Sequence, residues 1–178
     1  KRQGVAEEKL NTPKAQLSSE TQNVDSENPS QQQLNSLLEH YQTGRLSDAE
    51  KLAESITQEF PKHQFGWQVL GVLLKQSGRV RESLVPSQKA VALSPQDALA
   101  LNNLGATLQE LGRLEEAEAI FTQAIALKPD FAGAHSNLGI TLKELGRLDE
   151  AEVSYKQAIV FKPDYAQAHS NLGDTLQE

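Results

Sequence analysis

Residues 98–129, ALALNNLGATLQELGRLEEAEAIFTQAIALKP, decide the fold because the chain contains them again in closely similar form. Residues 132–163 read AGAHSNLGITLKELGRLDEAEVSYKQAIVFKP, and residues 64–95 are a looser copy. The copies lie 34 residues apart, and each keeps a turn glycine and a closing proline. A fixed period of this kind predicts an array of helix–turn–helix repeats. The prolines and turn glycines that keep the step are Pro61, Pro95, Pro129, Pro163, Gly44, Gly78, Gly112 and Gly146.

The spacing of apolar residues within one copy independently indicates two helices. Leu101, Leu104 and Leu108 recur at intervals of three and four residues, which is the period of one face of an α-helix. We interpret Gly105 and Ala117 as small because the two helices cross closely there, and overpacking such a contact typically costs about 1–3 kcal/mol. The expected helix pairs are 31–43 with 47–60, 64–77 with 80–93, 97–111 with 115–127, and 131–145 with 149–161, followed by a single helix over 165–178.

The order of large and small residues in each copy resembles the tetratricopeptide repeat. That family has a large residue, then Leu-Gly, a second large residue, a small residue, an apolar residue, Ala and Pro. Here these are Leu101, Leu104-Gly105, Leu108, Ala117, Phe121, Ala124 and Pro129, and the next copy matches with His135, Leu138-Gly139, Leu142, Ala151, Tyr155, Ala158 and Pro163. The resemblance covers residues 31–178. It implies an all-α fold, an α-solenoid whose stacked hairpins form a right-handed superhelix.

The chain therefore divides into a polar N-terminal arm, residues 1–29, and an array, residues 30–178. The expected units are 30–63, 64–97, 98–131, 132–165 and a truncated fifth unit, 166–178. The arm is rich in Gln, Glu, Ser, Asn and Lys, a composition that does not fold alone. We expect it to lie along the array or along a neighbouring copy.

Three local features depart from a regular repeat. Leu37 stands in the first unit where the later units have the glycine of the Leu-Gly pair. Pro86 falls inside an expected helix, where proline removes a hydrogen bond, so we expect a kink or an early break. Asp130 and Asp164 follow closing prolines, and we expect their side chains to cap the next helix.

Composition excludes several classes of function. The formal net charge is -7 and no basic stripe exists, which argues against nucleic-acid binding. Cysteine is absent, so disulfides and cysteine metal sites are excluded. No apolar run approaches the roughly 20 residues of a membrane span. The chain opens at Lys1 without methionine, so the initiator and any signal segment are not visible, and we expect a cytoplasmic protein.

Asparagines recur on the 34-residue grid of the first helix of each unit. The series is Asn35, Asn103, Asn137 and Asn171, and Val69 alone interrupts it. With the run Ala-His-Ser-Asn-Leu-Gly, the series resembles the repeats of the O-linked N-acetylglucosamine transferase. That resemblance implies that the amides line the concave wall and bond the backbone of an extended peptide. The alternative is that they bond neighbouring helices and only tolerate the inner surface. Further expected wall residues are Asn102, Gln68, Lys75 and Lys143.

The remaining candidate residues are interpreted as structural. His135 and His169 lie one period apart, at the position of Trp67, but two histidines without a third ligand make a poor metal site. No nucleophile is paired with a base and no glycine loop suits phosphate, so we expect no catalytic site, no metal and no cofactor. Chaperone-tail binding is also disfavoured, because Leu38 replaces an asparagine of the family's carboxylate clamp.

The sequence thus predicts a protein-interaction scaffold, not an enzyme, that binds an extended peptide or flexible segment in its groove. Two alternatives stay open. In the first, the chain is the substrate-recognition arm of a larger enzyme whose catalytic domain lies beyond residue 178. In the second, it is a self-assembling module. Self-association would use the apolar faces at Leu172 and Leu176 or the N-terminal arm.

Overall fold

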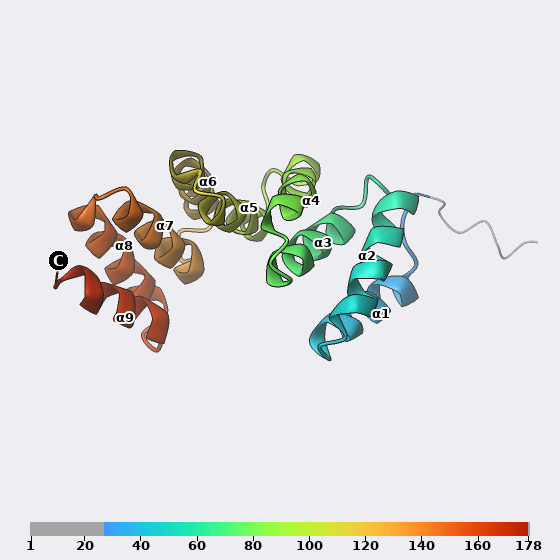
Figure 1. The fold of residues 1–178 in the computed structure, drawn as a ribbon, viewed down its shortest axis with the longest axis horizontal. Coiled ribbons are helices and arrows are strands. Elements are labelled where there is room, and N and C mark those ends of the chain that lie inside the picture. Colours follow the sequence, from blue (N-terminus) through green and yellow to red (C-terminus); the bar gives the residue numbers. More distant parts are fainter. Residues whose placement is uncertain (1–26, 178) are drawn as a thin grey trace, which may run out of the picture.

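The computed structural model describes residues 27–177, and this part of the chain consists of helices joined by short turns without any strand. Consecutive helices pack as hairpins, and the hairpins form an elongated row with α1 and α9 at opposite ends (Figure 1). The chain is an all-α helical solenoid. The helices are α1 (Gln31–Gln42), α2 (Leu46–Glu59), α3 (Gln64–Gln76), α4 (Val80–Leu93), α5 (Ala98–Glu110), α6 (Leu114–Leu127), α7 (Ala132–Glu144), α8 (Leu148–Phe161) and α9 (Ala166–Thr175).

The expected helix bounds agree with these to within one residue, except at the end of α9. Most of the expected arm, residues 1–26, and the terminal Glu178 lie outside the described residues. The odd-numbered helices are called A helices below, and the even-numbered ones B helices.

The turn inside each hairpin follows from its glycine. Gly112 has φ +72°, a left-handed conformation that other residues adopt only with strain. Its N–H donates to the carbonyl of Gln109 at 2.8 Å, and the N–H of Arg113 donates to the carbonyl of Leu108 at 2.9 Å. These two bonds form a Schellman motif, which satisfies the last carbonyls of the A helix and reverses the chain. Gly44, Gly78 and Gly146 have the same positive φ, so the predicted turns are confirmed.

In the third and fourth hairpins, a glycine on the A helix faces a large ring on the B helix. A Cβ atom at Gly105 would lie 2.6 Å from the ring of fully buried Phe121, and one at Gly139 would lie 2.6 Å from the ring of Tyr155. In the first hairpin the sizes are exchanged. Leu37 is fully buried on α1, and the residue on α2 that corresponds to Phe121 is Ala53. The missing glycine of the first unit is therefore compensated by a small partner.

The expected aspartate caps and the expected early break at Pro86 are wrong. Helices α7 and α9 begin one residue later than Asp130 and Asp164 would require, so their N-caps are Phe131 and Tyr165, without a side-chain bond. Helix α4 runs unbroken through Pro86. The carbonyl that this proline leaves without a helical partner belongs to Glu82, an exposed residue in the first turn, so the lost hydrogen bond lies at the surface and not in the core.

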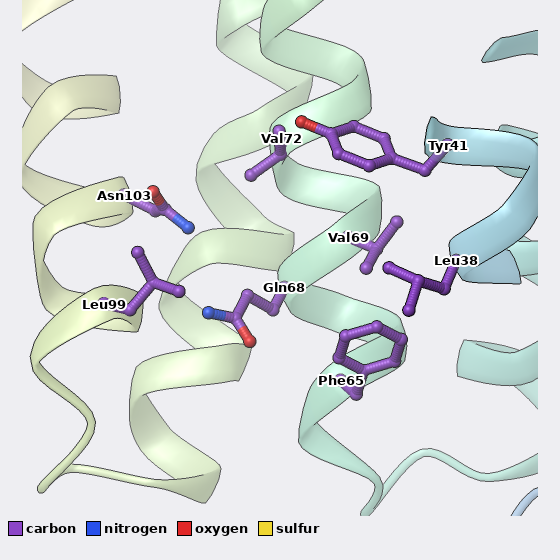
Figure 2. A pocket seen from close by; sticks show the side chains of 8 residues that line it. All are labelled: Leu38, Tyr41, Phe65, Gln68, Val69, Val72, Leu99 and Asn103. Atoms are coloured by element: carbon purple, nitrogen blue, oxygen red, sulfur yellow. The ribbon is translucent and has the colours of Figure 1, made fainter. Parts of the chain in front are cut away.

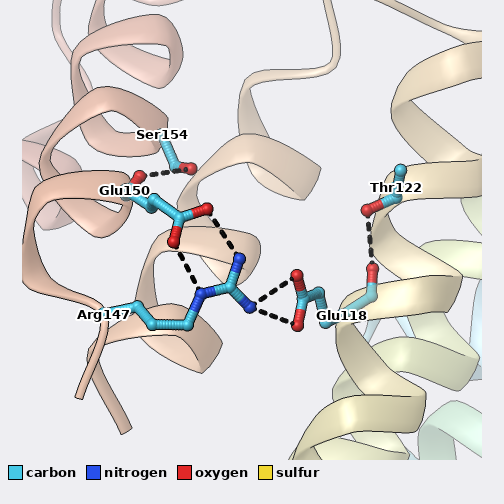
Figure 3. Close-up of polar contacts among 5 residues, drawn as sticks. All are labelled: Glu118, Thr122, Arg147, Glu150 and Ser154. Carbon is cyan, nitrogen blue, oxygen red and sulfur yellow. Dashed lines mark hydrogen bonds and ion pairs between the residues drawn. The ribbon is translucent and has the colours of Figure 1, made fainter. Parts of the chain in front are cut away.

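Two pairs of successive B helices, α2 with α4 and α6 with α8, are each joined by an arginine that binds two carboxylates. Arg147 donates to both oxygens of Glu118 on α6, at 2.7 and 2.8 Å, and to Glu150 on its own helix (Figure 3). Arg79 joins α4 to α2 in the same way through Glu50. Arg113 has only the partner within its own helix, because the position on α4 that corresponds to Glu50 and Glu118 is Leu84. The described B helices α4 and α6 therefore lack this ionic connection.

Candidate functional site

The A helices of successive units form one continuous wall of the array. Helices α3 and α5, α5 and α7, and α7 and α9 approach each other closely. Helix α1 stands farther from α3, although the amide of Gln76 still donates to the Tyr41 hydroxyl at 3.1 Å across the gap. The separation between α1 and α3 leaves room for a pocket at this end of the wall.

That pocket, called the α1–α3–α5 pocket below, has a volume of about 290 Å³ and is mainly apolar. Figure 2 shows side chains from three A helices converging on it. Leu38 and Leu99 are 42% and 52% exposed, so two leucines of its lining face solvent instead of packing in a core. The lining residues are Leu38, Tyr41, Phe65, Gln68, Val69, Val72, Leu99 and Asn103. None of them is charged.

Two amides border this apolar surface without partners. The side chains of Gln68 on α3 and Asn103 on α5 point into the space between these helices (Figure 2). Neither forms a hydrogen bond with any described residue. Each side chain therefore keeps both its donors and its acceptor for a ligand, and together they match the N–H and C=O groups of an extended main chain.

The other asparagines of the series are engaged with neighbouring side chains. Asn137 on α7 donates its amide N–H to Asn102 on α5 at 3.0 Å. Asn35 accepts from Gln31 at 2.9 Å, within α1. Asn171 accepts from Gln167 at 2.8 Å, while its own Nδ2 is buried without a partner among the described residues. Of the four asparagines, Asn103 is the one whose amide is wholly unbonded within the described part.

The two lysines expected on the wall occupy different surroundings. Lys75 forms an ion pair with Glu110 on the next A helix, with 3.3 Å between Nζ and the carboxylate oxygen. Lys143 lines a second cavity of about 350 Å³ at the other end of the wall, together with Asn171 and Ile140. Of the predicted wall residues, Gln68 and Asn103 thus line the apolar pocket and Lys143 and Asn171 line the second cavity. The lining of neither cavity includes the other four, which are Asn35, Asn102, Asn137 and Lys75.

Sequence reasoning missed the apolar half of the wall. Phe65, Val69 and Val72 lie at i, i+4 and i+7, and they form a second apolar stripe beside the core residues of α3. Leu99 occupies the same grid position as Phe65, 34 residues later. The signal was present where Val69 interrupts the asparagine series, because a valine replaces an amide on a surface that was expected to be polar.

Trp67, His135 and His169 each bond to the proline that precedes their own helix, in α3, α7 and α9. The Trp67 indole N–H donates to the carbonyl of Pro61 at 2.9 Å, and a ring nitrogen of His135 lies 2.9 Å from the carbonyl of Pro129. His169 makes the equivalent contact with Pro163. Within residues 27–177, no cluster of three or more His, Cys, Asp or Glu side chains has the arrangement of a metal site. In the same residues, no helix is long and apolar enough to cross a membrane.

Family models match two overlapping parts of the array. One, described as a tetratricopeptide repeat, matches residues 96–159, and another, described as a TPR repeat, matches residues 141–178. Residues 96–178 therefore match the tetratricopeptide repeat. No curated protein sequence matches it significantly.

Solved structures share the same solenoid fold. The chain superposes on TTC0263 from Thermus thermophilus, a thermophilic TPR protein, with a TM-score of 0.66 and 24% identity over 80% of this chain and 78% of that one. It superposes on YrrB, described as having an unusual peptide-binding site, with a TM-score of 0.71 and 22% identity over 78% and 71%. The first repeat domain of Spaghetti (RPAP3), bound to an HSP90 peptide, gives 0.62 and 21% over 64% and 90%. These similarities show the fold.

Proposed function

We propose that this repeat array is a protein-interaction scaffold that holds an extended peptide against its A-helix wall. One bulky apolar side chain of the ligand enters the α1–α3–α5 pocket, and its main chain bonds to the neighbouring amides. The observation that carries the proposal is the uncharged cavity of about 290 Å³, bordered by the unpartnered side chains of Gln68 and Asn103. A cavity with an apolar lining and a few convergent polar groups suits a ligand better than bulk water.

Magnitudes indicate which contact gives most of the affinity. Fully burying one leucine-sized side chain contributes about 1.5–3 kcal/mol. Each main-chain hydrogen bond to an amide contributes a net of about 0.5–1.5 kcal/mol. The pocket therefore supplies the anchor, while Gln68 and Asn103 fix the direction of the chain that leaves it.

The asparagine series extends this contact toward α9. The Asn137 side chain donates one amide N–H to the side-chain oxygen of Asn102. The other donors and acceptors of both amides stay open to a ligand. Asn171 still has an unpartnered Nδ2. In this proposal they bind the ligand's main chain downstream of the anchor, as the likeness to the O-linked N-acetylglucosamine transferase repeats suggests.

Two of the structural neighbours support a peptide ligand, since YrrB is described with a peptide-binding site and RPAP3 with a bound HSP90 peptide. The present wall differs from a carboxylate clamp in one respect. At its anchor end Leu38 stands in place of a clamp asparagine and no cation lines the pocket, so the preferred ligand is apolar at the anchor and not acidic.

The test is a peptide-array screen on the intact chain, followed by titration of the best peptide. Leu99→Gln should weaken binding about tenfold or more, because about 1.4 kcal/mol is one factor of ten in affinity. Asn103→Ala should weaken it several-fold. Val160→Gln, on the exposed face of α8, is the matched control and should change nothing. Equal affinities for Leu99→Gln and the control would exclude the pocket from binding.

A second candidate function is self-association at the α9 end. Leu176 is 61% exposed, whereas Leu172 packs against the core of α7 and α8. Leu176→Gln should then lower the mass measured by light scattering, and an unchanged mass would argue against this face. If the chain instead serves as the substrate-recognition arm of a larger enzyme, the chain alone should bind the peptides that this enzyme modifies, and it should modify none of them.

A further inference from the structure

We propose that the α1–α3–α5 pocket is also a binding site for the chain's own N-terminal segment, with Leu17 as the side chain that enters it. The segment would compete with foreign peptides for the groove. This inference shares the pocket with the proposed function but does not depend on a foreign ligand. Three observations carry it: the uncharged lining of the pocket, the position of α1, and the pattern of the preceding sequence.

The chemistry of the lining selects one residue of the segment. Residues 1–26 contain four bulky apolar side chains, Val5, Leu10, Leu17 and Val24. Only Leu17 stands at the centre of five consecutive uncharged residues, Ala-Gln-Leu-Ser-Ser at 15–19. Each of the other three has a charged residue within two positions. Because no charged residue lines the pocket, a charge carried beside the anchor would lose its hydration without gaining a partner.

The length of the connecting chain also fits Leu17. The pocket contacts α1 at Leu38 and Tyr41, which lie roughly 12–17 Å along the helix from its N-cap, Ser30, at 1.5 Å per residue. The thirteen-residue connection from Leu17 to Ser30 has a root-mean-square span of roughly 20 Å if it behaves as a flexible chain. Val24 is joined by only six residues, which reach about 20 Å when fully extended. Leu17 therefore reaches the pocket without stretching the chain.

Tethering makes even a weak contact significant. Covalent linkage through a connection of this length gives an effective concentration on the order of millimolar, which is highest when the length of the linker matches the span. Leu17 in the pocket would be flanked by Gln16 and Ser18, whose polar groups suit the unpartnered amides of Gln68 and Asn103. A foreign peptide must then displace the segment, so the apparent affinity of the groove is lower than its intrinsic affinity.

The absence of cysteine allows a direct test on the full chain. A nitroxide label on Ser19→Cys should broaden the methyl NMR signals of Leu38, Val72 and Leu99. Adding Leu17→Ser should remove most of this broadening, whereas adding Leu10→Ser, the matched control, should retain it. The control is needed because any label on the segment spends some time near α1.

Three results would overturn the inference: no broadening of the pocket methyls, equal broadening with and without Leu17→Ser, or equal effects of Leu17→Ser and Leu10→Ser. Mixing labelled chains with isotope-enriched unlabelled chains identifies a second copy as the occupant. Broadening that appears only in that mixture also contradicts an intramolecular contact. The result is independent of the peptide screen. If Leu17→Ser does not change the broadening but the pocket still binds a foreign peptide, only this inference is rejected. If Leu17→Ser removes the broadening but no peptide binds, only the proposed function is rejected.

Discussion

Replacing Gly105 by alanine tests whether the contact between A and B helices sets the geometry of a hairpin. The added Cβ would lie 2.6, 2.8 and 2.9 Å from three ring carbons of Phe121, which is fully buried and has no space to move into. Overpacking of this kind costs about 1–3 kcal/mol. Alanine is more favourable than glycine inside a helix by about 0.5–1 kcal/mol. We therefore expect a net loss of about 0.5–2 kcal/mol, measured as a lower urea midpoint by circular dichroism.

The matched control is Gly173→Ala, since a Cβ there meets nothing within 4 Å. This change should stabilise α9 by about 0.5–1 kcal/mol. Two chemically identical substitutions should therefore change the free energy of unfolding in opposite directions. Replacing the ring by a smaller side chain, Phe121→Leu, should relieve the clash. The double-mutant cycle of Gly105→Ala with Phe121→Leu should give a favourable coupling of about 0.5–3 kcal/mol. If Gly105→Ala is as stable as the control, or if the coupling is zero, the packing argument is wrong.

Three further changes test other parts of the array. Arg147→Gln should lower the urea midpoint at pH 7, and progressively less as the pH falls below 4.5. The guanidinium lowers the pKa of Glu150 in the folded protein below its ordinary value of 4.5. The ion pair therefore stabilises the fold above pH 4.5, and this stabilisation is lost as the pH falls through the folded-state pKa. An effect of the substitution that does not depend on pH would contradict this. Gly112→Ala should cost about 1–2 kcal/mol, measured by urea denaturation, although its Cβ would meet nothing within 4 Å, because φ is +72°. Ser30→Ala should remove the capping box of α1 and cost about 0.5–2 kcal/mol, detected as faster amide hydrogen exchange at Gln33 and not at α5.

The fold was predictable because each unit repeats the same local signals. The turn glycines, the closing prolines and the apolar stripes agree four times over, so an error in one copy is corrected by the others. The wrong predictions concern features that depend on the exact position of a single residue, such as a helix cap. Asp97 caps α5 with its side chain, yet Asp130 lies one position too early to cap α7, and a shift of one residue is invisible to the repeat pattern.

The site was only partly predictable. The grid locates Asn103 and Asn137 on the same helix face, but their environments depend on the neighbouring helix. Asn137 donates to Asn102, whereas the residue that corresponds to Asn102 in the preceding unit is Gln68, and its side chain forms no hydrogen bond with Asn103. The pocket also requires the larger separation of α1 from α3, which arises from packing between units, and no pattern within one unit encodes it.

The missing arginine connection at the middle of the row affects how the groove can change its width. Between the second and third units, the A helices are held by Lys75 with Glu110 and by the amide of Gln64, which donates to Asp97. On the opposite side, Leu84 leaves Arg113 without a carboxylate on α4. Among the described residues, the ionic and amide contacts at this joint therefore lie on its A-helix edge alone. Spreading of α4 from α6 would break none of them and would narrow the A-helix wall where Leu99 and Asn103 lie.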